Sequence, residues 1–162
     1  MVSEKVVKIL NRLRDEETTA SLQYMNHYAV LKNLNLHFIA EFLEKIAIEE
    51  MKHAEDLTDR LLDLETNPGG YKAKPAPHWG LAPLENLKKD IALEIEAIKE
   101  YNDAIDLCVK EKDHITRQLL DRILADEEKH KLRLQDFHNA LEKVGDMKGA
   151  MIGLMQALKG DK

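Results

Sequence analysis

The chain contains an internal repeat at an offset of 77 residues, and the repeat carries acidic and histidine side chains inside apolar helical patterns. Each copy has a glutamate followed 33 residues later by Glu-x-x-His. The polar residues that coincide are Glu17 with Glu94, Tyr24 with Tyr101, Glu50 with Glu127, and His53 with His130. Because self-similarity at a fixed offset indicates one structural unit present twice, the two halves are expected to share a fold.

Apolar residues recur at the 3.6-residue spacing of a helix in four long stretches. The predicted helices cover about 3–32, 36–65, 83–111 and 114–144, with a short tail helix over about 147–158. Pro and Gly in TNPGG (66–70) cannot continue the second helix, whereas Pro83 suits the first turn of the third. Asp113 can cap the fourth helix, and Gly145 is predicted to end it.

The connections between these helices define the expected topology. Short turns join the first helix to the second and the third to the fourth, which makes two antiparallel hairpins. The crossover, residues 66–82, has 17 residues and could reach about 55 Å, longer than a helix of about 30 residues at roughly 45 Å. We therefore expect one all-α domain over residues 1–162, a ferritin-like four-helix bundle with one long crossover and a short C-terminal fifth helix.

The repeated polar residues should meet near the middle of this bundle. In an antiparallel hairpin, residues equally far from the turn lie at similar height, so Glu17 faces Glu50 and Glu94 faces Glu127. Residues three apart on a helix are neighbours on one face, which adds the histidine of each Glu-x-x-His to the same cluster. The sequence therefore predicts four carboxylates and two imidazoles at one place.

Such a cluster needs cations. Four carboxylates carry a formal charge of −4, and uncompensated ions in an apolar core cost many kcal/mol. Two divalent cations would neutralise this charge with both histidines neutral. Oxygen and imidazole ligands suit iron or manganese, and this arrangement of Glu and Glu-x-x-His is typical of di-iron and di-manganese bundles. The alternative is a bundle with some buried or solvated polar residues and no metal.

Composition limits other functions. A formal net charge of −6 without a basic stripe argues against nucleic-acid binding. The single cysteine, Cys108, allows no intrachain disulfide and favours a reducing cytoplasm. The first residues, MVSEKVVKIL, do not have the pattern of a signal peptide, and GAMIGLMQAL (149–158) is about half a membrane span. We therefore expect a cytoplasmic protein that does not enter a membrane.

With these residues identified, the chain resembles bacterioferritin over nearly its whole length. The segments that match the family's four ligand regions in order are EETTASLQY (16–24), IEEMKHAEDLTDRL (48–61), DIALEIEAI (90–98) and LADEEKH (124–130). The resemblance implies an iron-storage ferroxidase that oxidises Fe²⁺ with O₂ or H₂O₂. It also implies a homo-oligomeric shell of 24 subunits built from two-fold dimers, with a b-type haem between two subunits and a ferredoxin-like electron donor.

The resemblance also implies roles for particular residues. Two irons per subunit, which manganese or zinc could replace, would be bound by Glu17, Glu50, His53, Glu94, Glu127 and His130. Glu50 and Glu127 would bridge the two ions, and each histidine would bind one. Iron could then pass to a mineral core, or the two ions could stay as a cofactor; the sequence leaves both open.

Tyr24 and Met51 are two further residues that the resemblance singles out. Tyr24 matches a family tyrosine beside the site and could hydrogen-bond a ligand or supply an electron; a buried core tyrosine is the alternative. Met51 matches the axial haem ligand that each subunit contributes. Its counterpart in the repeat is Glu128, and it lies about 100° around the helix from Glu50. The alternative for Met51 is an apolar contact in a subunit interface.

Some positions depart from the family pattern. Leu57 and Arg133 replace aromatic residues found in other members, and Lys45 with Glu49 replaces the His and Asp of an inner-surface iron site, which is expected to fail or change. Among other polar residues, we expect His27 and His37 at the surface or in an interface. His78 and Trp79 of the crossover are expected to pack against the bundle without a chemical role.

Two other di-iron classes share parts of the motif. A rubrerythrin-like peroxidase usually has a carboxylate where this chain has Ala97, and usually carries a second iron site that needs four cysteines. A di-iron oxygenase-type protein is normally much longer than 162 residues. Both remain as alternatives to the ferroxidase.

Overall fold

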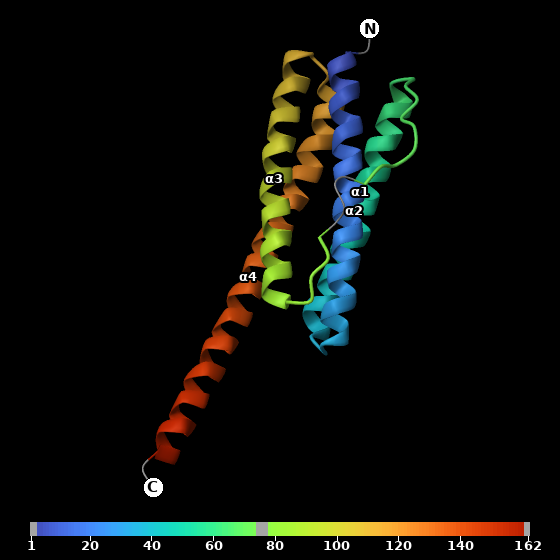
Figure 1. The fold of residues 1–162 in the computed structure, drawn as a ribbon. Coiled ribbons are helices and arrows are strands. Elements are labelled where there is room, and N and C mark those ends of the chain that lie inside the picture. The colour runs from blue at the N-terminus through green and yellow to red at the C-terminus, as the bar shows by residue number, and fades with distance from the viewer. Residues whose placement is uncertain (1–2, 74–77, 161–162) are drawn as a thin grey trace.

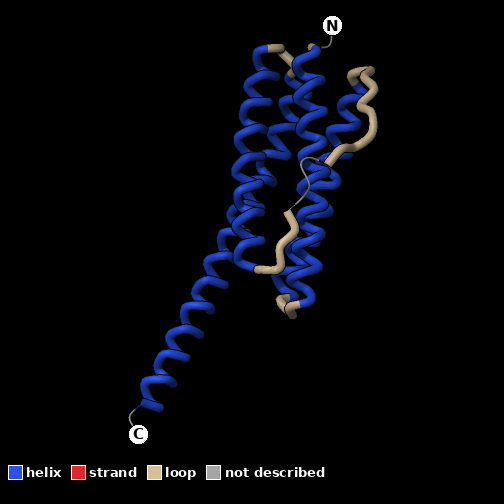
Figure 2. Tube along the Cα trace, viewed as in Figure 1, coloured by secondary structure: helices blue, strands red, loops and turns tan. Residues whose placement is uncertain are grey.

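The computed structural model describes residues 3–73 and 78–160, with side chains described as far as residue 147. Within these residues the chain forms four helices and no strand: α1 (Glu4–Asn33), α2 (His37–Asp63), α3 (Pro83–Lys110) and α4 (His114–Gly160). They run side by side as a bundle (Figure 1), and the long loop between α2 and α3 runs along it (Figure 2). The predicted four-helix bundle with one long crossover is confirmed.

Two hairpins, α1–α2 and α3–α4, meet mainly through α1 and α3. Buried apolar side chains form two separate clusters. One contains Ala20, Tyr24, Leu31, Ile39, Ala40, Leu43, Ile46, Ala47, Leu87, Leu134 and Phe137. The other contains Val6, Leu10, Leu13, Leu57, Leu61, Tyr101, Ala104, Cys108, Leu120 and Ile123. On every helix the repeated glutamates and histidines fall between the members of these two clusters, so apolar packing borders the polar layer at both ends.

The turns of the two hairpins have the same backbone structure at positions 77 apart. Asn35 and Lys112 both have a left-handed backbone, with φ of 61°. The next N–H in each turn reaches back to the helix: Leu36 donates to Leu31 at 3.0 Å, and Asp113 donates to Cys108 at 2.9 Å. This is the Schellman arrangement that ends a helix, and it shows that the repeat extends to the turns.

The crossover is attached to α1 and α3 by polar contacts. Arg14 donates to the carbonyl of Gly70 at 3.0 Å, and the backbone N–H of Lys72 donates to Asp15 at 3.2 Å. Farther on, Asn86 donates to the carbonyl of Gly80 at 2.9 Å. Pro83 occupies the first turn of α3, as predicted. Residues 74–77 of the predicted crossover lie outside the described residues.

The prediction of a separate fifth helix is wrong, because α4 continues through Gly145 to Gly160. Asp113 caps its start as predicted, accepting from the N–H of Thr116 at 3.0 Å. A glycine ends a helix when it takes a left-handed backbone, and among the described glycines only Gly69 has a positive φ. No proline follows Gly145, and a helical glycine costs only about 1 kcal/mol relative to alanine. The C-terminal part of α4 projects beyond the ends of the other three helices (Figure 1).

No helix in the described part of the chain combines the length and apolar character needed to cross a membrane. The assignment of all 162 residues to a single domain stays a prediction.

Candidate metal centre

The structure brings the six repeated acidic and histidine side chains together in the polar layer of the bundle. Each of the four helices contributes. All six are at most 4% exposed: Glu17 on α1, Glu50 and His53 on α2, Glu94 on α3, and Glu127 and His130 on α4. Their convergence was predicted from the repeat alone. Their role as metal ligands stays a prediction that the geometry can be used to argue.

Each histidine points its Nδ1 atom toward the carboxylates. Nδ1 of His53 lies 2.9 Å from Glu50, 3.1 Å from Glu127 and 3.7 Å from Glu17. Nδ1 of His130 lies 3.1 Å from Glu50, with two other carboxylates of the cluster at 3.9 and 4.0 Å. The two imidazole rings stack with their centroids 6.2 Å apart. The cluster is therefore one compact constellation and not two separate sites.

Ligand atoms in the described residues form two overlapping groups, each with its atoms within 4.8 Å of one another. The first group is Glu17, Glu50, His53 and Glu127, and the second is Glu50, Glu94, Glu127 and His130. Glu50 and Glu127 belong to both groups. A carboxylate has two oxygens, so a shared glutamate can bind one ion with each. The arrangement suits two neighbouring ions with two bridging carboxylates.

Burial and mutual repulsion control the charges of the metal-free cluster. Burial, and then the charge of Glu50, raises the pKa of Glu17 and that of Glu127 to about 8. Burial and the charge of Glu127 hold the pKa of Glu94 well above its usual range. For Glu50, burial acts in the same direction but hydrogen bonds to both histidines outweigh it, and the pKa falls to about 2.

The histidines respond in the opposite way. Burial lowers the pKa of His130, but the hydrogen bond and charge of Glu50 outweigh this and raise it to about 9. The pKa of His53 is also raised, because hydrogen bonds to Glu127, Glu17 and Glu50 outweigh its burial. Without metal, the raised pKa values therefore keep protons on carboxylates and imidazoles of the cluster near neutral pH.

A buried atom of the cluster has unused bonding capacity. Among the described residues, Oε2 of Glu94 has no hydrogen-bond partner, and Oε1 of Glu50 and Oε1 of Glu127 each lie 3.1 Å from the Nδ1 atom of a histidine. Buried polar atoms without partners are rare and costly, so the Glu94 oxygen is available to a cation. A donor set of carboxylate oxygens and imidazole nitrogens fits iron or manganese. The residues present therefore fit a pair of such ions.

Two tyrosines cross between the hairpins to hold carboxylates of the cluster. Tyr24 on α1 donates to Glu94 on α3, and Tyr101 on α3 donates to Glu17 on α1. Both hydroxyls are buried. Tyr24 was predicted beside the site, and of its two possible roles the structure contains the hydrogen bond. Tyr101 was missed, although its coincidence with Tyr24 in the repeat was the signal that could have identified it.

A second pair of carboxylates lies behind the histidines. Nε2 of His130 is 3.0 Å from Glu49, and Nε2 of His53 is 3.6 Å from Asp126. Carboxylates in this position orient metal-binding histidines in other proteins. Sequence reasoning missed this role. Glu49 and Asp126 are also 77 residues apart, but because their side chains differ, the repeat of identical residues does not reveal them.

Met51 lies away from the cluster. Its side chain is 54% exposed on α2, as expected for a residue off the metal-facing side of the helix. Exposed apolar residues on the same hairpin include Leu22 and Met25 on α1 and Ile48 on α2. The thioether of Met51 is thus available at the surface of the protomer, and its proposed role needs a partner outside it.

The expectation that His27 lies at the surface or in an interface is wrong. His27 is wholly buried, and its Nδ1 lies 2.8 Å from the buried Asp90. Its Nε2 lies 3.0 Å from Nδ1 of His78 on the crossover. Gln23 joins this group, donating to Asp90 at 2.9 Å and accepting from the N–H of His78 at 3.0 Å. Trp79, expected to pack on the bundle, is 63% exposed.

The comparisons with known proteins agree with this architecture. Residues 7–144 match the model of the ferritin-like domain, which defines the class as a ferritin-like helical bundle. The chain is 33% identical over 141 residues to a bacterioferritin of Mycolicibacterium paratuberculosis, with 87% of this chain and 88% of the relative covered. It is 34% identical over 126 residues to a bacterioferritin of Rhodobacter capsulatus, with 78% of each chain covered.

Among solved structures, that of Rhodobacter capsulatus bacterioferritin matches with a TM-score of 0.85 and 30% identity, covering 93% of this chain and 94% of that one. It is described as having a metal-free dinuclear site and haem iron in a crystallographic special position. The chain belongs to the bacterioferritin family. Rubrerythrin-like and oxygenase-type proteins, kept as alternatives from the sequence, are not the family that these matches indicate.

Proposed function

We propose that the protein is a ferroxidase of iron storage and detoxification, which binds two Fe²⁺ in the cluster of six residues and oxidises them. The observation that carries the proposal is the pair of overlapping ligand groups that share Glu50 and Glu127 inside a buried layer. Two Fe²⁺ would each give up one electron, and with two protons these reduce O₂ to H₂O₂, or H₂O₂ to two water molecules.

The residues of the cluster would have different roles in binding the two ions. Glu50 and Glu127 would bridge the two ions, Glu17 with His53 would hold one, and Glu94 with His130 the other. The hydroxyls of Tyr24 and Tyr101 keep Glu94 and Glu17 in place from the opposite hairpin. Carboxylates favour Fe³⁺ over Fe²⁺ because they are hard anionic ligands, so oxidation strengthens binding. Manganese or zinc could bind to the same ligands. A further proposed role of Tyr24 is to supply an electron to the site.

Family membership supports a larger assembly. We propose a cytoplasmic homo-oligomer, a shell of 24 subunits built from two-fold dimers, with a ferredoxin-like protein as electron donor for iron release. The exposed thioether of Met51 fits an axial ligand to a b-type haem shared by two subunits, because an atom that serves a two-fold axis has to lie at the surface of the protomer.

Anaerobic Fe²⁺ titration followed by stopped-flow oxidation tests the ferroxidase. Wild type should bind two Fe²⁺ per chain and oxidise them with O₂ or H₂O₂. Glu50→Ala and His130→Ala should reduce the rate to that of Fe²⁺ in buffer, because each removes a ligand from the constellation. Glu128→Ala is the matched control, since Glu128 adjoins Glu127 but pairs with Lys131. Unchanged rates in the first two variants would contradict the proposal.

The haem assignment is tested separately by absorption spectra of the purified assembly. Wild type should show a Soret band with about one haem per two chains, and Met51→Leu should lose it while keeping its size in gel filtration. Met25→Leu changes another exposed methionine of the same hairpin and should keep the band. Retention of haem by Met51→Leu would exclude Met51 as the ligand.

A further inference from the structure

A polar group separate from the candidate metal centre lies where α1, α3 and the crossover meet. Nδ1 of His27 lies 2.8 and 2.9 Å from the two carboxylate oxygens of Asp90, and both residues are wholly buried. A carboxylate can only accept hydrogen bonds, so Nδ1 carries the proton, and the neutral ring keeps its lone pair on Nε2. Asp90 therefore fixes His27 in the form that presents an unprotonated nitrogen on its other side.

The neighbour on that side is a second imidazole. Nε2 of His27 lies 3.0 Å from Nδ1 of His78 on the crossover. Gln23 holds this arrangement at both ends, because it donates to Asp90 at 2.9 Å and accepts from the backbone N–H of His78 at 3.0 Å. Two imidazole nitrogens bound to one tetrahedral Zn²⁺ at about 2.0–2.1 Å lie roughly 3.3 Å apart. The two nitrogens are therefore already close to the separation that a shared zinc ion requires.

An amide oxygen without a partner lies beside the ring of His78. Asn86 is wholly buried, and its Nδ2 donates to the carbonyl of Gly80 at 2.9 Å, which fixes the orientation of the amide. Its Oδ1 has no hydrogen-bond partner in the described part of the chain. A Cβ on Gly80 would lie 2.5 Å from this oxygen and 2.7 Å from Cε1 of His78, so the oxygen and the ring border one small space. Buried polar atoms without partners are rare and costly, so this oxygen would be stabilised by a donor.

The contact between the two histidines prevents His78 from being that donor. When Nδ1 of His78 donates to His27, the neutral ring has no proton on Nε2. A metal ion bound to Nδ1 takes the place of that proton, and the neutral ring then carries its proton on Nε2, on the side of Asn86. Each histidine then has an oxygen acceptor behind it, Asp90 for His27 and Asn86 for His78. Metal-binding histidines are held by such acceptors in other proteins.

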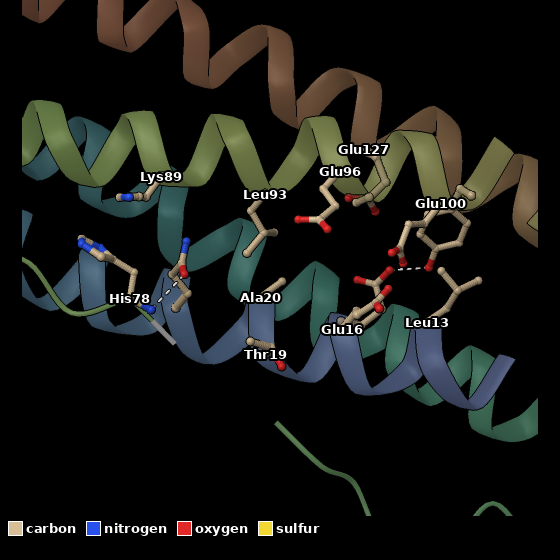
Figure 3. A pocket seen from close by; sticks show the side chains of 14 residues that line it. Leu13, Glu16, Thr19, Ala20, His78, Lys89, Leu93, Glu96, Glu100 and Glu127 are labelled. Atoms are coloured by element: carbon tan, nitrogen blue, oxygen red, sulfur yellow. Dashed lines mark hydrogen bonds between the residues drawn. The ribbon is translucent and has the colours of Figure 1, made fainter. Parts of the chain in front are cut away.

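A cavity gives water and ions access to the two rings. It has a volume of about 450 Å³, and His78 and Gln23 are among the residues that line it. Figure 3 shows His78 and Lys89 at one end of this cavity, with Glu127 and Glu100 at the other. The two histidines are therefore separate from the cluster of six residues. Water in the cavity can complete the coordination of an ion that is held by two nitrogens.

Charge also favours a cation between the rings. Asp90 supplies a buried negative charge, which two neutral histidines and the amide of Gln23 do not cancel. A buried carboxylate of this kind is stabilised by a positive charge nearby. Lys89 lies at the same end of the cavity, but its side chain is exposed, so water screens its charge.

We propose that His27 and His78 form a zinc site, in which Nε2 of His27 and Nδ1 of His78 bind one Zn²⁺ and water completes a tetrahedral arrangement. Neutral imidazoles are common zinc ligands. Asp90 and Asn86 are positioning residues, because each sets the tautomer of the histidine in front of it. The ion ties the crossover to α1. The inference does not depend on the proposed function, since none of these residues belongs to the cluster.

Metal analysis after equilibrium dialysis of the chelator-treated assembly against Zn²⁺ tests the site. His78→Gln removes Nδ1 and should bind one Zn²⁺ per chain fewer than wild type, whatever number the cluster holds. His27→Asn keeps a donor facing Asp90 but removes Nε2, and should lose the same ion. Trp79 is the single tryptophan and follows His78 directly. Its fluorescence should change as Zn²⁺ is added to wild type and stay constant in His78→Gln.

His114→Gln is the matched control, because His114 is exposed at the start of α4. This variant should bind as much Zn²⁺ as wild type, and circular dichroism should show the same helical content in all the variants. Retention of the ion by His78→Gln or by His27→Asn would overturn the inference, and so would an equal loss in His114→Gln. Failure of the cluster to bind or oxidise Fe²⁺ would overturn the proposed function but would not alter the difference between wild type and His78→Gln.

Discussion

Each histidine of the candidate metal centre has carboxylate neighbours on both ring nitrogens, and these neighbours have different roles. Nδ1 faces the carboxylates of the cluster, and Nε2 faces a carboxylate behind it, Glu49 for His130 and Asp126 for His53. A hydrogen bond from Nε2–H to a carboxylate fixes the ring orientation and leaves Nδ1 as the lone-pair donor. Glu49 therefore determines which nitrogen of His130 is available to a metal without binding it, and Asp126 lies behind His53 in the same place at the longer distance of 3.6 Å.

Removing the negative charge behind a histidine should weaken metal binding. Glu49→Gln and Asp126→Asn each keep a polar side chain of the same size but make the imidazole a weaker ligand, so the affinity for Co²⁺ should fall by about 10- to 100-fold. Equilibrium titration followed by the visible absorption of Co²⁺ measures the loss.

The control for these variants is Glu44→Gln, which changes another carboxylate of α2 outside the cluster. Thermal unfolding of the metal-free proteins should be similar in all three, since the effect acts through the metal. If Glu49→Gln binds Co²⁺ as tightly as wild type, His130 does not depend on Glu49 for its orientation.

At the scale of the elements, one point at which the crossover is attached to the bundle is a buried polar group. Asp90 on α3, His27 on α1 and His78 on the crossover form a chain of contacts at 2.8 and 3.0 Å. Asp90 and His27 are wholly buried. A buried carboxylate is tolerated only when donors surround it, so His27 is needed both by α3 and by the crossover.

We expect His27→Ala to destabilise the protein by about 2–4 kcal/mol, because it leaves Asp90 buried with one donor fewer and removes the contact of His78. Chemical denaturation of the metal-free protein measures this free energy. His37→Ala is the control: His37 is exposed at the start of α2 and should change stability by less than about 0.5 kcal/mol. Equal losses in the two variants would show that the buried group carries no stability.

The positions of the helices could be predicted from local signals in the sequence. The continuation of α4 past Gly145 and the burial of His27 could not. Periodic apolar residues, Pro83 and Asp113 placed the starts of α3 and α4 correctly because these signals act within one turn. Gly145 gave the wrong stop, since a glycine permits a helix end without requiring one. The burial of His27 depends on His78, 51 residues away, and a contact of that kind leaves no local pattern in the sequence.

At the scale of the whole molecule, the metal-free bundle holds more protons in its folded state than in its unfolded state. The pKa of Glu17 and that of Glu127 rise from an ordinary 4.5 to about 8, and that of His130 rises from 6.5 to about 9. Stability from such groups is fully present below their unfolded pKa values and is lost as the pH rises through the folded ones. Glu50, lowered to about 2, acts only in strong acid.

The melting temperature of the metal-free protein should therefore fall between about pH 5 and pH 9. Metal ions replace the protons, so the metal-loaded protein should lose less stability over this range or gain it. Calorimetry of chelator-treated and Mn²⁺-loaded protein measures both. The double variant Glu17→Gln, Glu127→Gln should have a flatter pH profile without metal. A metal-free profile that rises across this range would contradict the proton-holding cluster.

The repeat reveals only the site residues that are identical in both of its copies, and this limits how much of the site could be predicted from the sequence. Residues identical at both positions, such as Glu50 and Glu127, were identified because chance coincidence of six ligands is rare. Tyr101 was visible in the same repeat, but its bond to Glu17 needed the packing of α1 on α3.

The two halves of the metal centre are alike in their ligands but unequal in their support. His130 has its carboxylate at 3.0 Å, whereas the shorter Asp126 stands 3.6 Å from His53. Under the proposed function, the two halves would fill in sequence: the first ion would bind beside His130, and the second would enter a site whose charge is already partly cancelled. The half-filled protein would then be a distinct species, able to accept a different metal as its second ion.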